Sequence, residues 1–306
     1  MLEFVPLNAE TAPLALEVYQ PWVERISYYF PISAEGFAHT LFSQPWVHPA
    51  RFEISPAASQ VALEDGKPVG WVQAGYVSGI ASIPAGECDA LVRCLLVLPG
   101  RKDVGRALLA HALKTLAERE VRSWRAFEHS SGYTFATGIG KAPRNMTEVM
   151  EVLAERGFAP DDTNFVYVTE DLKARPSGKE VADVKPEILI RGWQEWPEGV
   201  EWDQFNFTER GEKVGYATVV TLERLTSYPG EDTLFVKGIA VETQHHRRGI
   251  GHLIMQTLWD YYRPLGIRRL ILNTADNNYV AQKFYEAIGF NMPDLVSSLQ
   301  VERPIG

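Results

Sequence analysis

The sequence repeats itself in outline, and this internal duplication limits the folds that the chain can adopt. In the first half, the strand-like segment "DALVRCLLVLP" leads into Gly105 and a helical pattern; in the second half, "DTLFVKGIAVE" leads into Gly249 and another. Gly105 and Gly249 stand 144 positions apart, whereas Phe158 of "LAERGF" and Phe290 of "YEAIGF" stand 132 positions apart. The repeat predicts two copies of one domain.

The two copies differ in two places. Because the offset falls from 144 to 132, the first copy carries twelve extra residues, within the glycine-rich stretch "HSSGYTFATGIGKAPR". We expect a flexible surface loop there, since its "TGIGK" lacks the spacing and the trailing Ser or Thr of a phosphate-binding P-loop. The first copy also has two helical stretches within residues 11–57, and the second has no room for them between "EILIRG" and its next strand.

Turn and linker signals divide the chain further. Asp65 and Gly66 lie between two strand-like segments and predict a tight hairpin. Residues 170–187 are polar, contain Pro176, Gly178 and Pro186, and show no hydrophobic period, which is typical of a linker. We therefore expect domains at residues 1–172 and 186–306, joined by a linker at 173–185.

Composition narrows the classes of partner. A formal net charge of -9 and a pI near 5.4 argue against nucleic acid or an anionic membrane, which need a basic face, and suit a small cationic amine better. Cys88 and Cys94 show no metal-site or disulfide pattern, so we expect two thiols in a reducing compartment and no metal site. The start "MLEFVPLNAE" has no basic or apolar region of the kind that signal peptides carry, so we expect no signal peptide, and no apolar run is long enough to span a membrane. These features predict a cytoplasmic protein. Monomer and homodimer both stay open as its oligomeric state.

The stretch "TQHHRRGIGHLIM" places two glycines at the start of a helix. Free backbone N–H groups at a helix N-terminus bind anions, and a glycine lets a phosphate approach the main chain closely. A phosphate or pyrophosphate site is one interpretation, and a tight turn with a solvated basic rim is the other. A metal site at His245 and His246 is disfavoured because adjacent side chains point apart, and a dinucleotide-binding fingerprint would need a third glycine.

The downstream segment "NNYVAQKFYEAIGF" adds context. Together with "IAVETQHHRRGIGHLIM", it resembles the GCN5-related N-acetyltransferase (GNAT) family, with Asn278, Ala281, Tyr285, Gly289 and Phe290 in the family's usual places. The resemblance is strong over residues 214–292 and weaker over residues 60–160. It implies an α/β fold of the α+β type, with two tandem GNAT-like domains that are each a mostly antiparallel, mixed sheet flanked by helices.

The resemblance implies acetyl-CoA, or a related acyl-CoA, as the donor substrate. Its pyrophosphate would lie on the main chain around the two glycines, and its pantetheine would run beside the preceding strand. His246 stands where the family has Gln or Arg, and we expect Arg247 or Arg248 to replace that side chain. The implied donor-binding residues are Ile239, Ala240, Val241, His246, Arg247, Arg248, Gly249, Ile250, Gly251, His252, Asn278, Ala281 and Tyr285.

The implied chemistry is attack of a neutral primary amine on a thioester. A backbone N–H near Ile239 would stabilise the developing oxyanion, and Tyr285 would return a proton to the leaving thiolate. Packing in the core is the alternative role for Tyr285. Glu231 and Asp232 are candidates for the general base, although both also fit solvated turn positions.

The first copy has lost much of this pattern. Asp103 lies in the segment that matches the glycine loop, and Leu153 replaces the tyrosine. We hypothesise that the first domain, with Trp193, Trp196 and Trp202, closes the acceptor side of the second. The leading hypothesis is an N-acetyltransferase that acts on the amine of a small molecule. A non-catalytic acyl-CoA-binding regulator and a mycothiol-synthase-like acyltransferase for a larger acceptor stay open.

Overall fold

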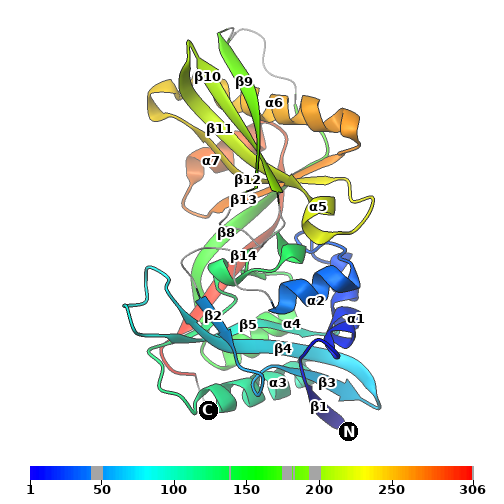
Figure 1. The fold of residues 1–306 in the computed structure, drawn as a ribbon. Helices are drawn as coiled ribbons and strands as arrows, with labels where there is room; N and C mark the ends of the chain where they lie inside the picture. Colours follow the sequence, from blue (N-terminus) through cyan, green and yellow to red (C-terminus); the bar gives the residue numbers. More distant parts are fainter. Residues whose placement is uncertain (43–50, 138, 174–180, 182, 193–200, 305–306) are drawn as a thin grey trace. The chain divides into compact units, whose positions relative to one another are not determined.

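The computed structural model describes residues 1–304 except 43–50, 138, 174–180, 182 and 193–200. These residues form two compact units, each a mixed sheet flanked by helices (Figure 1). The described residues of unit 1 lie in 1–163 and 294–304, and those of unit 2 lie in 164–293. The mixed α/β class expected from the sequence is confirmed.

Unit 1 is built on a sheet with the strand order β1-β3-β4-β5-β6-β14, in which β2 also pairs with β4 and β7 with β14. The β5–β6 pair is parallel, and the β3–β4 and β4–β5 pairs are antiparallel. The elements are β1 (Leu2–Pro6), α1 (Ala12–Val23), α2 (Ala34–Phe42), β2 (Arg51–Ile54), β3 (Gln60–Glu64), β4 (Lys67–Ser78), β5 (Asp89–Val97), α3 (Lys102–Leu116), β6 (Trp124–Ala126), β7 (Ala142–Pro143) and α4 (Thr147–Glu155), with parts of β8 (Ala159–Thr169) and β14 (Asn291–Val301).

Local sequence explains this arrangement. Asp65 and Gly66 have φ angles of 51° and 76°, so the expected tight hairpin between β3 and β4 is confirmed. Gly70 and Trp71 are neighbours on β4, and their side-chain positions therefore face opposite sides of the sheet. A Cβ on Gly70 would meet α3, whereas the Trp71 ring packs against Phe37 of α2. The helix pairs α1–α2 and α3–α4 thus cover opposite faces.

Unit 2 has the strand order β8-β13-β12-β11-β10-β9. Only the β12–β13 pair is parallel among the ladders that join these strands in the described residues. The elements are β9 (Val184–Gly192), β10 (Glu201–Glu209), β11 (Glu212–Thr221), α5 (Leu222–Thr226), β12 (Thr233–Val241), α6 (Ile250–Tyr262), β13 (Arg269–Ala275) and α7 (Tyr279–Ala287). Figure 1 shows α6 lying along β11 and β12.

One hydrophobic core holds the two long helices of unit 2 against the sheet. Ile254 and Leu258 of α6 and Tyr285 of α7 are buried in the same cluster as Ala217 and Val219 of β11. The helices α1 and α2 of unit 1 have no described counterpart here, since the chain between β9 and β10 consists of residues 193–200, outside the described part. The sequence expectation that the second copy lacks these helices agrees with this spacing.

The last strand of each sequence half belongs to the sheet of the other half's unit. Residues 164–169 of β8 pair with β13 in unit 2, and residues 296–301 of β14 pair with β6 and β7 in unit 1. The compact units therefore differ at both ends from the sequence-based domains at 1–172 and 186–306. In addition, β9 begins at Val184, inside the segment expected to be the linker.

Candidate donor site

In unit 2, β12 and β13 separate after their first residues. These strands pair only at their beginnings, from Thr233↔Arg269 to Phe235↔Ile271, although β12 continues to Val241. The first four residues of β12 are buried, and the last five, Lys237–Val241, are half-buried. The second half of β12 thus leaves main-chain groups on the β13 side without a strand partner in the described sheet.

A β-bulge lies where this separation begins. The ladder between β11 and β12 shifts between Val219↔Val236 and Thr218↔Gly238, so Lys237 is the extra residue. A bulge turns the local main chain and re-aims its N–H and C=O groups. Ile239, Ala240 and Val241 follow it and pair with Ala217, Tyr216 and Gly215 of β11. The sequence predicts an oxyanion amide near Ile239 but not the bulge, for which Gly238 within a strand pattern is the available signal.

Residues 242–249, which we call the donor loop, join β12 to α6. Arg247 and Gly249 both have left-handed backbones, with φ angles of 60° and 89°. The amide of Leu253 makes an intrahelical hydrogen bond, to the Gly249 carbonyl at 3.1 Å. The amides of Ile250, Gly251 and His252 precede that bond and, as the first N–H groups of a helix, carry the positive end of its dipole.

The basic side chains of the donor loop differ in what they contact. His246 Nε2 lies 2.9 Å from the Val241 carbonyl oxygen, so this ring bonds back to the end of β12. Arg248 donates to both carboxylate oxygens of Glu209, at 2.9 Å and 2.5 Å, and Arg247 has an exposed side chain. Of the two arginines considered as substitutes for the family's side chain, Arg248 is therefore held by a carboxylate.

Residues of α7 complete this side of the unit. Asn278 caps the helix: its Oδ1 accepts from the Ala281 amide at 3.3 Å, and its Nδ2 donates to Thr274 Oγ1 at 3.2 Å. A Cβ on Gly251 would lie 3.3 Å from the Phe284 ring, so this glycine lets α6 approach α7 closely.

Tyr285 lies among aromatic rings. It is 5% exposed, with ring centroids 5.5 Å from Tyr167 and 5.7 Å from Phe290. Burial, and next the neighbouring Tyr167, raise the pKa of Tyr285 to about 12. The hydroxyl therefore keeps its proton at neutral pH, as a proton donor requires. Core packing and the catalytic role are both compatible with this position.

Glu231 and Asp232 lie at the opposite end of β12 from the donor loop. Glu231 Oε1 accepts from Thr233 Oγ1 at 2.7 Å and lies 3.6 Å from Arg269. Lys237 is five residues beyond Asp232 along the strand, which corresponds to roughly 16 Å. This placement does not support either carboxylate as a base at the bulge.

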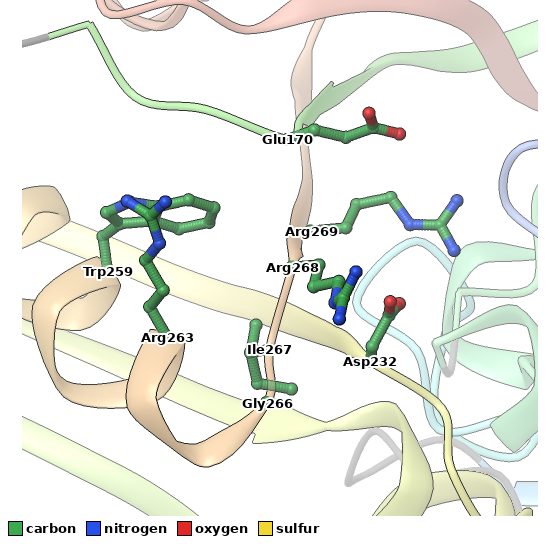
Figure 2. Close-up of a pocket in the computed structure, with 8 residues that line it drawn as sticks. All are labelled: Glu170, Asp232, Trp259, Arg263, Gly266, Ile267, Arg268 and Arg269. Atoms are coloured by element: carbon green, nitrogen blue, oxygen red, sulfur yellow. The ribbon is translucent and has the colours of Figure 1, made fainter.

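A pocket of about 680 Å³ is associated with this other end of β12. It is lined by Glu170, Asp232, Trp259, Arg263, Gly266, Ile267, Arg268 and Arg269. Figure 2 shows Arg263 against Trp259 on one side and Arg268, Arg269 and Asp232 on the other. Since it adjoins the beginnings of β12 and β13, the pocket is separate from the donor loop.

The strand of unit 1 that corresponds to β12 is β5, and it is buried along its whole length. All nine residues of β5 are buried, and its bulge residue is Arg93, which stands 144 positions before Lys237. The Arg93 side chain is fully buried, donates to the carbonyls of Leu41 and Ser131, and lies 4.0 Å from the Tyr133 ring centroid. A guanidinium and an aromatic ring thus fill the region beside the bulge in unit 1.

The extra stretch of the first copy supplies Ser131 and Tyr133, which contact Arg93; we call these three residues the plug. The prediction of a flexible surface loop was wrong: Ser131, Tyr133, Phe135 and Lys141 are each at most 3% exposed. The Tyr133 and Phe135 rings stack at 4.8 Å, and Phe135 lies 4.4 Å from Tyr19 of α1. The stretch is polar and glycine-rich by composition, but its aromatic residues anchor it in the core.

Carboxylates of the chain itself occupy the start of α3. Glu148 accepts from the Gly100 amide at 2.9 Å. Asp103 pairs with Arg101 at 3.1 Å, and this contact lowers the pKa of Asp103. Leu153, at the position that matches Tyr285, is fully buried. That the first copy has lost the donor chemistry stays a prediction, which these features favour.

Comparison with known proteins identifies the family of unit 2. Residues 166–290 match the family model described as "Acetyltransferase (GNAT) family". Unit 2 belongs to the GNAT family. Over 95 residues the chain is 32% identical to [Ribosomal protein bS18]-alanine N-acetyltransferase of Escherichia coli (strain K12), a match that covers 31% of this chain and 58% of that relative.

Solved structures extend the GNAT fold to the whole chain. A tandem GNAT protein from the clavulanic acid biosynthesis pathway superposes with a TM-score of 0.66 at 17% identity, with 100% of both chains covered. A GCN5-related N-acetyltransferase from Sphaerobacter thermophilus gives 0.59 at 12% identity, covering 99% of this chain and 96% of its own. The tandem arrangement of two GNAT folds expected from the sequence is confirmed.

Across the described residues, no group of three or more His, Cys, Asp and Glu side chains is arranged to hold a metal ion. Likewise, no described helix is long and apolar enough to cross a membrane.

Proposed function

We propose that the protein is an N-acetyltransferase with one acetyl-CoA site per chain, in the GNAT domain of unit 2. The observation that carries this proposal is the contrast between equivalent strands: β5 is buried throughout, whereas β12 is half-buried from its bulge onward and leads to the N-terminus of α6. The donor would fit this cradle, since its pyrophosphate suits the amides of α6 and the left-handed Gly249 leaves room for it.

In this proposal the thioester supplies the acetyl group, and the chain positions it. The amine forms the new C–N bond, the C–S bond breaks, and the amine's proton passes to solvent water. Main-chain amides at the bulge would stabilise the oxyanion. The Tyr285 hydroxyl would give its proton to the leaving sulfur.

The acceptor proposed is the primary amine of a small molecule, for which the net charge of -9 favours a cation. A protein N-terminal amine is the second candidate, because the relative from Escherichia coli is named for acetylation of an alanine of a ribosomal protein. The protein is expected to act in the cytoplasm.

Calorimetric titration with acetyl-CoA tests the donor site, and we expect one site per chain. Release of free thiol from acetyl-CoA should then be measured against polyamines, amino sugars, amino acids and peptides that begin with alanine. Turnover with small amines supports the proposal, and turnover with peptides alone selects the second candidate. Binding without turnover across the panel would indicate an acyl-CoA-binding regulator instead.

A further inference from the structure

Glu209, the last residue of β10, contacts the donor loop through Arg248. Arg248 Nη1 and Nη2 donate to Glu209 Oε2 and Oε1 at 2.9 Å and 2.5 Å, the two-pronged geometry in which an ion pair is most directional. Arg248 Nη1 also lies 2.7 Å from His245 Nδ1. Because arginine can only donate, His245 accepts through Nδ1 in this arrangement.

The backbone on either side of Arg248 needs such support. Arg247, which has a Cβ, is held at a φ of 60°, and Gly249 lies at 89°. A left-handed residue other than glycine persists only where its surroundings fix it. His246, bonded to the Val241 carbonyl, fixes the loop on one side, and the Arg248–Glu209 pair fixes it on the other.

We infer that Glu209 is a positioning residue for the donor site, an inference that rests on the proposed function. Through Arg248 it holds the donor loop in the shape that presents the first amides of α6 to the pyrophosphate. Arg248 then stabilises the donor loop and does not itself bind the pyrophosphate. In the opposite arrangement, Arg248 leaves Glu209 and binds the pyrophosphate. Removing the Glu209 carboxylate would then strengthen acetyl-CoA binding instead of weakening it.

The experiment compares Glu209→Gln and Arg248→Gln with the wild type and with Glu187→Gln, an exposed glutamate on the neighbouring β9. Affinities for acetyl-CoA and for acetyl-pantetheine, which has no pyrophosphate, are measured by calorimetry, and melting temperatures report folding. We expect Glu209→Gln and Arg248→Gln each to bind acetyl-CoA about fivefold more weakly than the wild type. The double variant should bind it no more weakly than either single variant. Acetyl-pantetheine binding by the two variants should not change, and the Glu187→Gln control should bind both ligands as the wild type does.

Each other outcome has a definite meaning. Tighter acetyl-CoA binding by Glu209→Gln, or a much larger loss in Arg248→Gln than in Glu209→Gln, would show that Arg248 is a pyrophosphate ligand and overturn the inference. Equal losses for acetyl-CoA and acetyl-pantetheine would reveal a general structural defect and also overturn it. A wild-type protein that does not bind acetyl-CoA contradicts the proposed function itself, and the inference falls with it.

Discussion

The hydroxyl of Tyr285 stays protonated over the whole physiological range because burial raises its pKa to about 12. Replacing Tyr285 with Phe keeps the ring that packs against Tyr167 and Phe290 but removes the proposed proton donor. Turnover should fall by about 10², with acetyl-CoA affinity near that of the wild type. Steady-state kinetics and calorimetry measure the two quantities. The control, Tyr261→Phe on the exposed side of α6, should leave both unchanged.

The pH dependence gives a second test of the same residue. Since the group is neutral below its pKa, ionisation of Tyr285 should not reduce wild-type turnover between pH 8 and 10. A fall in turnover in that window that disappears in Tyr285→Phe would mean that the hydroxyl ionises far below pH 12, contrary to its buried position.

Asp294 in unit 1 links burial to stability. It is 5% exposed, and burial raises its pKa to about 6 from the ordinary 3.8. The folded state therefore holds the proton more tightly than the unfolded state, and the free energy of unfolding decreases as pH rises from about 4 to about 6. Asp294→Asn should be more stable than the wild type by about 1–3 kcal/mol at pH 7–8. Urea denaturation at several pH values checks this, and a stability difference that does not shrink toward pH 4 would rule out the carboxylate as its cause.

At the scale of elements, the connection from β12 to α6 contains two residues with left-handed backbones, Arg247 and Gly249. Gly249 and Gly211 have nearly the same φ angles, 89° and 88°, but Gly211 lies in the β10–β11 hairpin. Alanine at either position strains the backbone by about 1–3 kcal/mol. Only Gly249→Ala should also obstruct the pyrophosphate, and we expect at least tenfold weaker acetyl-CoA binding. Calorimetry on both variants tests this, and equal affinities would show that the glycine matters for the turn alone.

Elements with a local signal could be predicted from the sequence, and elements set by distant packing could not. The Asp65-Gly66 hairpin and the glycine-led helix after β12 depend on backbone conformations that only a few residue types adopt. The residue types at these positions therefore predict both features. The plug of unit 1 depends on Arg93 meeting a stretch nearly forty residues later, and no local pattern records such a contact. The bulge at Lys237 lies between these cases, since Gly238 signalled it only weakly.

At the scale of the whole molecule, the duplication explains why strand membership was not visible in the sequence. Both halves end in a strand after a short helix, and two copies of one domain offer each strand two similar sheet edges. Choice between such edges depends on tertiary packing and not on the alternation of side chains along the strand. The composition of the sequence identifies the polar segment after residue 170. The same composition carries no information about which sheet the strands on either side of this segment join.

The exchanged strands predict that the two halves of the sequence assemble when made as separate chains. Fragment 1–178 contains β8, whose residues 164–169 pair with β13, and fragment 179–306 contains β14, which pairs with β6. We expect the co-expressed fragments to purify as a one-to-one complex, and each alone to aggregate because a sheet edge is exposed. Size-exclusion chromatography measures this. Val166→Pro, which removes an N–H from the middle of the β8 segment, should abolish the complex, whereas two fragments that are each monomeric and folded would show that neither half needs the other's strand.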